Sequence, residues 1–153
     1  MAEATPFGVH AALTVAPLDV ATLQRRVEHP GAGAVSLFVG NVREVHEGRE
    51  VLRIDYEAYA SMAERVLADV ATQVAAAHAG TRIAVEHRVG TLGVGEASVA
   101  IAVSHAHRGP AIAACTEVIE ALKRRVPVWK REHFADGTVA WVDPTAPLAE
   151  NRP

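Results

Sequence analysis

The 153-residue sequence has a single cysteine, Cys115, and no apolar run approaching the ~20 residues that a membrane-spanning helix requires. One cysteine excludes an internal disulfide and a multi-cysteine metal cluster, and it fits a reducing compartment. The first residues, Met1 to Pro6, lack the basic and apolar regions of a signal peptide. We therefore expect a cytoplasmic protein that does not cross or bind a membrane.

Lysine is also scarce. Of the 15 basic residues only Lys123 and Lys130 carry an amine, and the others are arginines. A guanidinium stays protonated, whereas a buried or cation-flanked lysine can lose its proton and act as a base or nucleophile. Two interpretations follow. Either the lysines act chemically, or Lys123 complements the negative end of a helix and Lys130 is a solvated charge.

The chain as a whole has no excess of positive charge. The formal net charge is −3, which argues against a nucleic-acid-binding protein because such proteins present a basic face. Residues 105–133 are an exception, with six lysines and arginines against three acidic residues. This segment is suited to hold an anion.

The chain does have enough apolar residues for one domain. Half of its residues are hydrophobic and 22% are charged, and a chain of this length buries roughly two-thirds of its unfolded surface. We expect a single domain over residues 1–142 and a proline-rich C-terminal tail over residues 143–153.

Hydrophobic periodicity and breaker residues predict a mixture of strands and helices. Strands are expected at 9–15, 34–40, 52–58, 82–89, 97–104, 128–132 and 138–142, and helices at 18–27, 61–79 and 110–125. The strand at 34–40 is predicted to be buried on both faces, and residues 41–50 to form a loop. Because strands and helices do not alternate strictly, the predicted fold class is α+β.

Residue spacing also predicts which side chains are buried. Leu52 lies on the predicted inner face of its strand, and Met62 and Ile112 lie on the apolar stripes of their helices. Cys115 falls on the same stripe as Ile112, which favours a core residue over a nucleophile. The segment 90–95 is interpreted as a hairpin turn, because no Gly-Lys-Ser/Thr follows its glycines.

The segment 104–110 joins a strand to the start of a helix. Helix N-termini present free N–H groups that suit phosphate or carboxylate, and His107 and Arg108 would add side-chain donors. Arg43 follows a strand end, which is a rigid mounting for a site residue. The alternative is that all three are ordinary exposed polar residues.

Other catalytic motifs are missing from the sequence. There is no His-Glu-x-x-His, and His105 and His107 have no third ligand at a recognisable spacing, so we expect no metal and no cofactor. There is also no Gly-x-Ser-x-Gly of a serine hydrolase.

The remaining motifs form a series of blocks in a fixed order. They are Gly-Asn-Val-Arg at 40–43, Tyr-Glu-Ala-Tyr at 56–59 with Met-Ala-Glu at 62–64, His-Arg-Val-Gly at 87–90 with Gly-Glu at 95–96, His-Arg at 107–108, Leu-Lys at 122–123 and Pro-Val-Trp-Lys-Arg-Glu at 127–132. Together, from about residue 33 to 142, they resemble the large, catalytic subunit of molybdopterin synthase. The chain departs from that family after Arg43, where Glu44, Val45 and His46 replace a frequent Asp or Asn followed by His-Asn, and at Ile112, which replaces a frequent phenylalanine.

The resemblance implies an α/β hammerhead-type fold with an additional small antiparallel β-subdomain. It implies a homodimer that forms a heterotetramer with two small ubiquitin-like sulfur-carrier subunits. Each carrier would deliver sulfur from a C-terminal Gly-Gly thiocarboxylate to cyclic pyranopterin monophosphate, forming the dithiolene of molybdopterin. Lys123 and Lys130 would be catalytic. The implied substrate-binding residues are Asn41, Val42, Arg43, His107, Arg108, Arg131 and Glu132.

The residues themselves agree with this implication. An anionic pterin phosphate requires cations, and sulfur chemistry without a usable cysteine requires an external donor. Arginines near the lysines should lower their pKa values and leave some neutral amine for proton transfer. Three other hypotheses remain: a non-catalytic phosphometabolite-binding module, a Schiff-base lyase that uses one of the lysines, and a structural adaptor.

Overall fold

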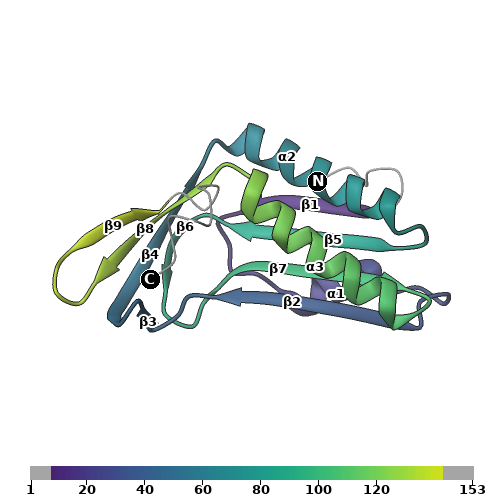
Figure 1. Ribbon diagram of the computed structural model, residues 1–153, viewed down its shortest axis with the longest axis horizontal. Coiled ribbons are helices and arrows are strands. Elements are labelled where there is room, and N and C mark those ends of the chain that lie inside the picture. Colours follow the sequence, from purple (N-terminus) through teal and green to yellow (C-terminus); the bar gives the residue numbers. More distant parts are fainter. Residues whose placement is uncertain (1–7, 143–153) are drawn as a thin grey trace.

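The computed structural model describes residues 8–142, which form two β-sheets and three helices (Figure 1). The predicted tail at 143–153 lies outside the described residues. The strands are β1 (Val9–Thr14), β2 (Ala34–Asn41), β3 (Val45–His46), β4 (Arg49–Ala58), β5 (Arg82–Arg88), β6 (Gly90–Gly93), β7 (Ala97–His105), β8 (Val128–Phe134) and β9 (Val139–Val142). The helices are α1 (Val20–Val27), α2 (Ala60–Ala77) and α3 (Arg108–Arg125).

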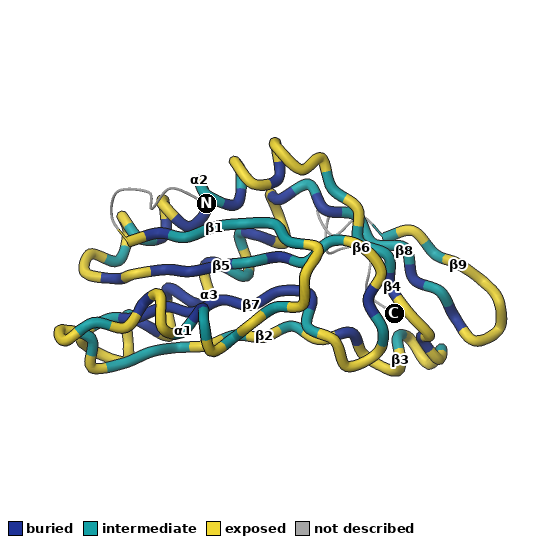
Figure 2. Tube along the Cα trace, turned by 180° about the vertical axis from the view of Figure 1, so that it is seen from behind, coloured by how far each residue is buried: buried dark blue, intermediate teal, exposed yellow. Residues whose placement is uncertain are grey.

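The first sheet has the strand order β1-β5-β7-β2, parallel between β1 and β5 and antiparallel elsewhere. Its central strands are buried on both faces, as the dark-blue stretches of Figure 2 show. On β7, Ile101 and Val103 join the core that also contains residues of α2 and α3, whereas Ala100 and Ala102 join the core formed with α1. The larger side chains of β7 thus pack on the face covered by α2 and α3, and its small alanine side chains pack on the face covered by α1.

The second sheet lies beyond one end of the first (Figure 1). Its strand order is β3-β4-β8-β9, and β6 pairs with a further part of β4. A small core of Val42, Val51, Ile54, Leu92 and Phe134 fills its inner side. This mixed architecture with a separate small antiparallel sheet confirms the α+β prediction.

The prediction that residues 34–40 are buried on both faces is wrong. Leu37 and Val39 are 44% and 38% exposed, and β2 is an edge strand of its sheet. The eight residues of α1 cover mainly β5, β7 and the start of β2, so no helix within residues 8–142 covers the later part of β2 on this face.

Two of the expected connections contain strands. Residues 45–46 and 49–50 pair in the predicted loop, and Glu47 and Gly48 between them both have positive φ, 51° and 75°. These angles are typical of a two-residue hairpin turn. Residues 90–93, expected to be a turn, form β6 and pair with β4, so this connector joins the two sheets.

Three predicted core residues are exposed: Leu52, Met62 and Ile112, at 47%, 47% and 56%. The register of β4 against β8 shifts between Val51 and Arg53. This irregularity buries Val51 and turns Leu52 outward, because one extra residue reverses the alternation of a strand. At the starts of the two long helices, Ala63 and Ala111 are buried in place of Met62 and Ile112, whereas later members of the predicted stripes, such as Val70, are buried as expected.

None of the helices within residues 8–142 is long and apolar enough to cross a membrane.

Candidate active site

A cavity of ≈190 Å³ lies where the two sheets meet. It is lined by the end of β2 and the residues after it, by the inner side of β4, by the start of β7, by the last turn of α3 and by β8. Its ionisable lining residues include Arg43, His46, Lys123, Lys130 and Glu132, and the predicted Asn41 and Val42 also line it. The cavity therefore collects six of the nine site residues predicted from the sequence, together with His46.

The two lysines reach the cavity from different elements. Lys123 lies in the last turn of α3, next to the buried Leu122 that fixes this end of the helix against the core. Lys130 lies in the middle strand of the second sheet, between Tyr56 on β4 and Val142 on β9. Because side chains alternate along a strand, Lys130 and Glu132 share the inner face of β8.

The surroundings of Lys123 lower the pKa of its amine. Although much of its side chain is exposed, partial burial lowers the pKa of Lys123, and the positive charges of Lys130 and Arg43 lower it further. The expected lowering thus occurs at Lys123, with loss of hydration as its largest cause. Lys123 in turn contributes to a lowered pKa of His87, for which burial is the main cause.

Glu132 is an almost fully buried carboxylate, 2% exposed. Its Oε1 lies 3.2 Å from Lys130 Nζ and 3.9 Å from His46 Nδ1, whereas its Oε2 is buried without a hydrogen-bond partner among the described residues. A buried carboxylate requires a cation nearby, so Glu132 and Lys130 hold each other in place.

Arg131 points away from the cavity. It donates to Asp55 Oδ2 at 2.9 Å on the outer face of the second sheet, where Asp55 also accepts from Thr91 at 2.7 Å and pairs with His133 at 2.7 Å. The Thr91 hydrogen bond, followed by those from His133 and Arg131, holds the pKa of Asp55 well below its ordinary value. Arg131, expected beside the substrate, is paired with Asp55 on the outer face of the second sheet.

His107 and Arg108 line a different hollow, of ≈530 Å³, at the start of α3 beside Gly33 and Ala34. A Cβ at Gly33 would overlap the carbonyl of Ala106, so glycine allows β2 to begin close to this junction. Lys123 lies near the other end of α3 (Arg108–Arg125), about 22 Å along the helix from Arg108. A single chain does not bring His107 and Arg108 to the lysines.

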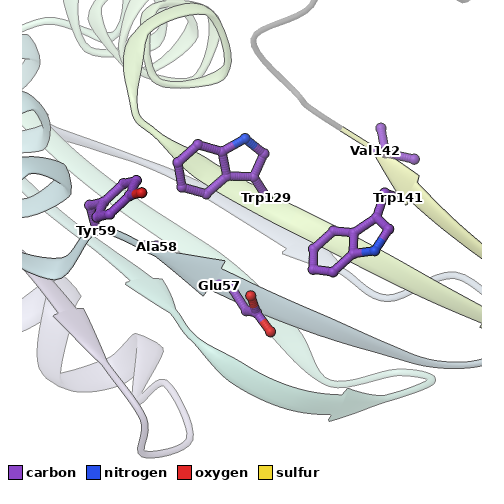
Figure 3. A pocket seen from close by; sticks show the side chains of 6 residues that line it. All are labelled: Glu57, Ala58, Tyr59, Trp129, Trp141 and Val142. Atoms are coloured by element: carbon purple, nitrogen blue, oxygen red, sulfur yellow. The ribbon is translucent and has the colours of Figure 1, made fainter.

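A third hollow, of ≈690 Å³, is an aromatic groove lined by Glu57, Ala58, Tyr59, Trp129, Trp141 and Val142 (Figure 3). Trp141 is 57% exposed and Tyr59 68%, and the Tyr59 and Trp129 rings meet edge to face at 5.4 Å. The sequence alone did not distinguish whether Trp129 belongs to the core or to a pocket wall, and in the structure it is part of a wall.

Sequence reasoning missed His46 and the aromatic groove. His46 was expected in a loop, and only its hairpin brings it over the cavity. Conversely, Cys115 is a core residue as predicted, and burial raises the pKa of its thiol.

Comparison with known proteins gives consistent matches. The family described as MoaE protein matches residues 13–125. The chain is 46% identical over 122 residues to the molybdopterin synthase catalytic subunit of Oryza sativa subsp. indica, an alignment that covers 80% of this chain and 63% of the rice protein. It is 40% identical over 125 residues to the protein of the same name from Bacillus subtilis, covering 82% and 80% of the two chains. The chain thus spans somewhat less than two-thirds of the rice relative's length.

Solved structures agree with these relatives. The crystal structure of molybdopterin synthase from Staphylococcus aureus matches with a TM-score of 0.83 and 33% identity, over 86% of this chain and 96% of that one. A complex of subunits 1 and 2 of the molybdopterin-converting factor from Helicobacter pylori matches with a TM-score of 0.68 and 18% identity, over 88% and 89% of the two chains. The likeness confirms the fold that the sequence resemblance implied.

Proposed function

The chain belongs to the MoaE protein family, and from this premise we propose that it is the catalytic subunit of a molybdopterin synthase. It would transfer sulfur from the C-terminal thiocarboxylate of a small carrier subunit to cyclic pyranopterin monophosphate, forming the dithiolene of molybdopterin. The observation that carries the proposal is the convergence of Arg43, Lys123 and Lys130, three cationic groups from separate elements, on one cavity.

The two lysines have different surroundings, and these support different roles. Lys123, whose pKa is lowered, supplies a neutral amine that accepts or relays a proton as the carrier's sulfur bonds to the pterin side chain. Lys130, held 3.2 Å from the Glu132 carboxylate, supplies positive charge to the acyl oxygen of the carrier. A preorganised cation at a site of developing negative charge is among the strongest catalytic effects available to a protein.

A second copy of the chain would complete the anion site. Strand β2 runs from the hollow of His107 and Arg108 to the lysine cavity, and its later part exposes Leu37 and Val39 along an edge strand. Its eight residues span about 27 Å, as does α3. A two-fold axis near the middle of β2 would therefore place His107 and Arg108 of each copy opposite the lysine cavity of the other. Such an isologous contact is the commonest form of homodimer, and the expected heterotetramer would follow when each copy binds one carrier.

The aromatic groove is the surface that we propose for docking of the carrier. Trp129 precedes Lys130 on β8, and Val142 of the groove pairs in register with Lys130. A carrier bound in the groove would thus lie across the sheet from Lys130, whose amine the C-terminus of the carrier must reach. Trp141 and Tyr59 are exposed in the groove, and the Arg131 guanidinium lies 5.2 Å from the centre of the Trp141 ring. Tryptophan, tyrosine and arginine are the residues most common in interface hot spots.

Binding of the carrier to this surface can be followed by tryptophan fluorescence, because Trp129 and Trp141 are the only tryptophans of the chain. Carrier binding should shift their fluorescence and protect them from a soluble quencher. Trp141→Ala should weaken carrier binding, while Val139→Ala, an exposed β9 residue outside the groove, should not. Unchanged quenching at saturating carrier would remove this surface from the proposal.

The function as a whole is tested by reconstitution. The full chain is mixed with a thiocarboxylated carrier and cyclic pyranopterin monophosphate, and the product is identified by mass. The proposal predicts a product that has gained two sulfur atoms in the absence of any other enzyme. Retention of the unchanged pterin would instead identify a non-catalytic phosphometabolite-binding module, which uses the same cations without the chemistry.

A further inference from the structure

We propose that His46 is a positioning residue that holds the Arg43 guanidinium over the lysine cavity and thereby sets the affinity for the anionic substrate. The inference rests on the proposed function and adds a residue to it.

The hairpin β3–β4 fixes the place of His46. His46 pairs with Arg49 across the two-residue turn formed by Glu47 and Gly48. Arg49 is itself held, because its guanidinium lies 3.6 Å from the centre of the Phe134 ring and it contacts Thr138 and Asp136 at the turn between β8 and β9. The segment is thus attached to the rest of the second sheet.

The hydrogen bond between Arg43 and His46 has only one direction. Arg43 Nη2 lies 3.2 Å from His46 Nδ1, and a guanidinium can only donate. His46 Nδ1 must therefore be the acceptor, which leaves the ring proton on Nε2. Nε2 faces the Glu47 carboxylate at 3.6 Å, an arrangement that favours this same tautomer.

The other charged groups around the ring define the alternative state. Glu132 Oε1 is 3.9 Å from His46 Nδ1 and 3.2 Å from Lys130 Nζ. A second proton on Nδ1 would remove the acceptor for Arg43 and turn that nitrogen into a competitor of Lys130 for Glu132. Only the neutral ring serves both pairs, with His46 holding Arg43 and Lys130 holding Glu132.

Holding Arg43 matters because this residue is otherwise exposed. A free arginine side chain loses rotamer freedom when it binds a ligand, and this loss weakens binding. Arg43 oriented beforehand by His46 avoids most of that loss. The contribution of His46 therefore belongs to substrate binding, and turnover at saturating substrate should not depend on it.

The test compares His46→Ala with His46→Asn in the full chain, assayed with the thiocarboxylated carrier. Asn Oδ1 occupies nearly the position of His Nδ1 and accepts a hydrogen bond in the same way. We expect His46→Ala to raise KM for cyclic pyranopterin monophosphate about tenfold, with kcat within about twofold, and His46→Asn to restore most of the affinity. Glu50→Gln, an exposed change on the same hairpin, is the matched control and should leave both constants unchanged.

A double-mutant cycle with Arg43→Ala separates positioning from a structural role. If His46 acts through Arg43, His46→Ala should have no further effect on KM once Arg43 is absent. Equal effects of His46→Ala in both backgrounds, or no recovery with asparagine, would overturn the positioning role while leaving the proposed function intact. If Arg43→Ala itself leaves KM unchanged, both the positioning role and the assignment of Arg43 fail.

Discussion

Both faces of strand β8 carry basic side chains next to a carboxylate, but the balance between positive and negative charge differs between the two faces. On the outer face, Arg131 and His133 share the Asp55 carboxylate, which also accepts from Thr91. On the inner face, Lys130 has the partly unsatisfied carboxylate of Glu132, and Lys123 and Arg43 are near enough to raise the local positive charge.

The difference shows how one strand can serve both stability and chemistry. A carboxylate with several donors is held in its charged form, and it balances the positive charge of its partners. A cavity with more cations than carboxylates leaves positive charge for an anion, and the neighbouring cations help to lower the pKa of Lys123. Because adjacent residues of a strand point in opposite directions, Lys130 and Arg131 belong to these two different environments.

The largest effect should come from the inner face. Lys123→Ala and Lys130→Ala should each reduce kcat roughly 10²–10⁴-fold, the usual contribution of a group that transfers a proton or stabilises charge. Arg131→Gln on the outer face should leave kcat at saturating carrier within a few-fold. Steady-state rates of dithiolene formation give both numbers, and an Arg131 variant as slow as the lysine variants would contradict the division between the faces.

Lys123→Arg provides a control for charge. It keeps the cation but cannot supply a neutral amine, so it should be nearly as slow as Lys123→Ala. Normal turnover by Lys123→Arg would favour a purely electrostatic or structural role for this position.

A second effect should come from the outer face and appear in stability. Asp55→Asn should lower the free energy of unfolding at neutral pH by about 1–3 kcal/mol, because Arg131 and His133 lose their charged acceptor. The pKa of Asp55 is lowered by folding, so its contribution is fully present above the ordinary carboxyl pKa and is lost as pH falls below it. Denaturant unfolding at neutral pH and near pH 3 should therefore show a difference between wild type and variant that shrinks in acid. A difference that grows in acid would contradict the sign.

A smaller effect concerns the titration of Lys123. Its lowered pKa means that the folded chain releases this proton at a lower pH than the unfolded chain does. Between the two pKa values the unfolded state binds more protons, so this group makes stability rise with pH there. The pH dependence of Lys123 acylation, followed by mass analysis of peptides, should show a pKa below the ordinary value. The Arg43→Ala variant should move it upward, and a downward movement would contradict the assigned cause.

The smallest effect tests the irregularity in β4 that decides which residues face the inner side. Leu52→Ser should change the free energy of unfolding by less than about 0.5 kcal/mol, as is usual for an exposed position. Val51→Ala should cost clearly more, because Val51 is 3% exposed in the small core. Thermal unfolding of both variants measures the two losses of stability. A larger loss for Leu52→Ser than for Val51→Ala would show that the register of β4 against β8 is wrong.

Much of the fold could be predicted from the sequence, because most strands and helices begin and end at breaker residues such as Pro127 and Gly80. The burial pattern was harder to predict. The predicted stripes are buried along most of both long helices, at Val70, Cys115 and Leu122 for example. Met62 and Ile112, near the helix starts, face outward, and the neighbouring Ala63 and Ala111 are buried in their place. The alternating pattern of β4 predicted that Leu52 faces inward. The shift in register that turns Leu52 outward cannot be seen in the sequence.

The site could be predicted in part. The scarcity of lysine identified Lys123 and Lys130, and the position after a strand identified Arg43, all of which line one cavity. The sequence did not reveal that Arg131 has its own partner on the opposite face, because that depends on Asp55, which is distant in the chain. The helix predicted over 110–125 already separated His107 and Arg108 from Lys123, but the sequence did not show how the two ends of this helix could contribute to one site.

The most direct test of the shared site is complementation between copies. Lys123→Ala and Arg108→Ala chains, each slow alone, are dissociated, mixed in equal amounts and reassociated before the assay. If one copy supplies the lysines and the other supplies His107 and Arg108, half of the dimers should be mixed and contain one intact site, which restores about a quarter of wild-type turnover. Activity that stays at the level of the separate variants would contradict the proposed site between copies.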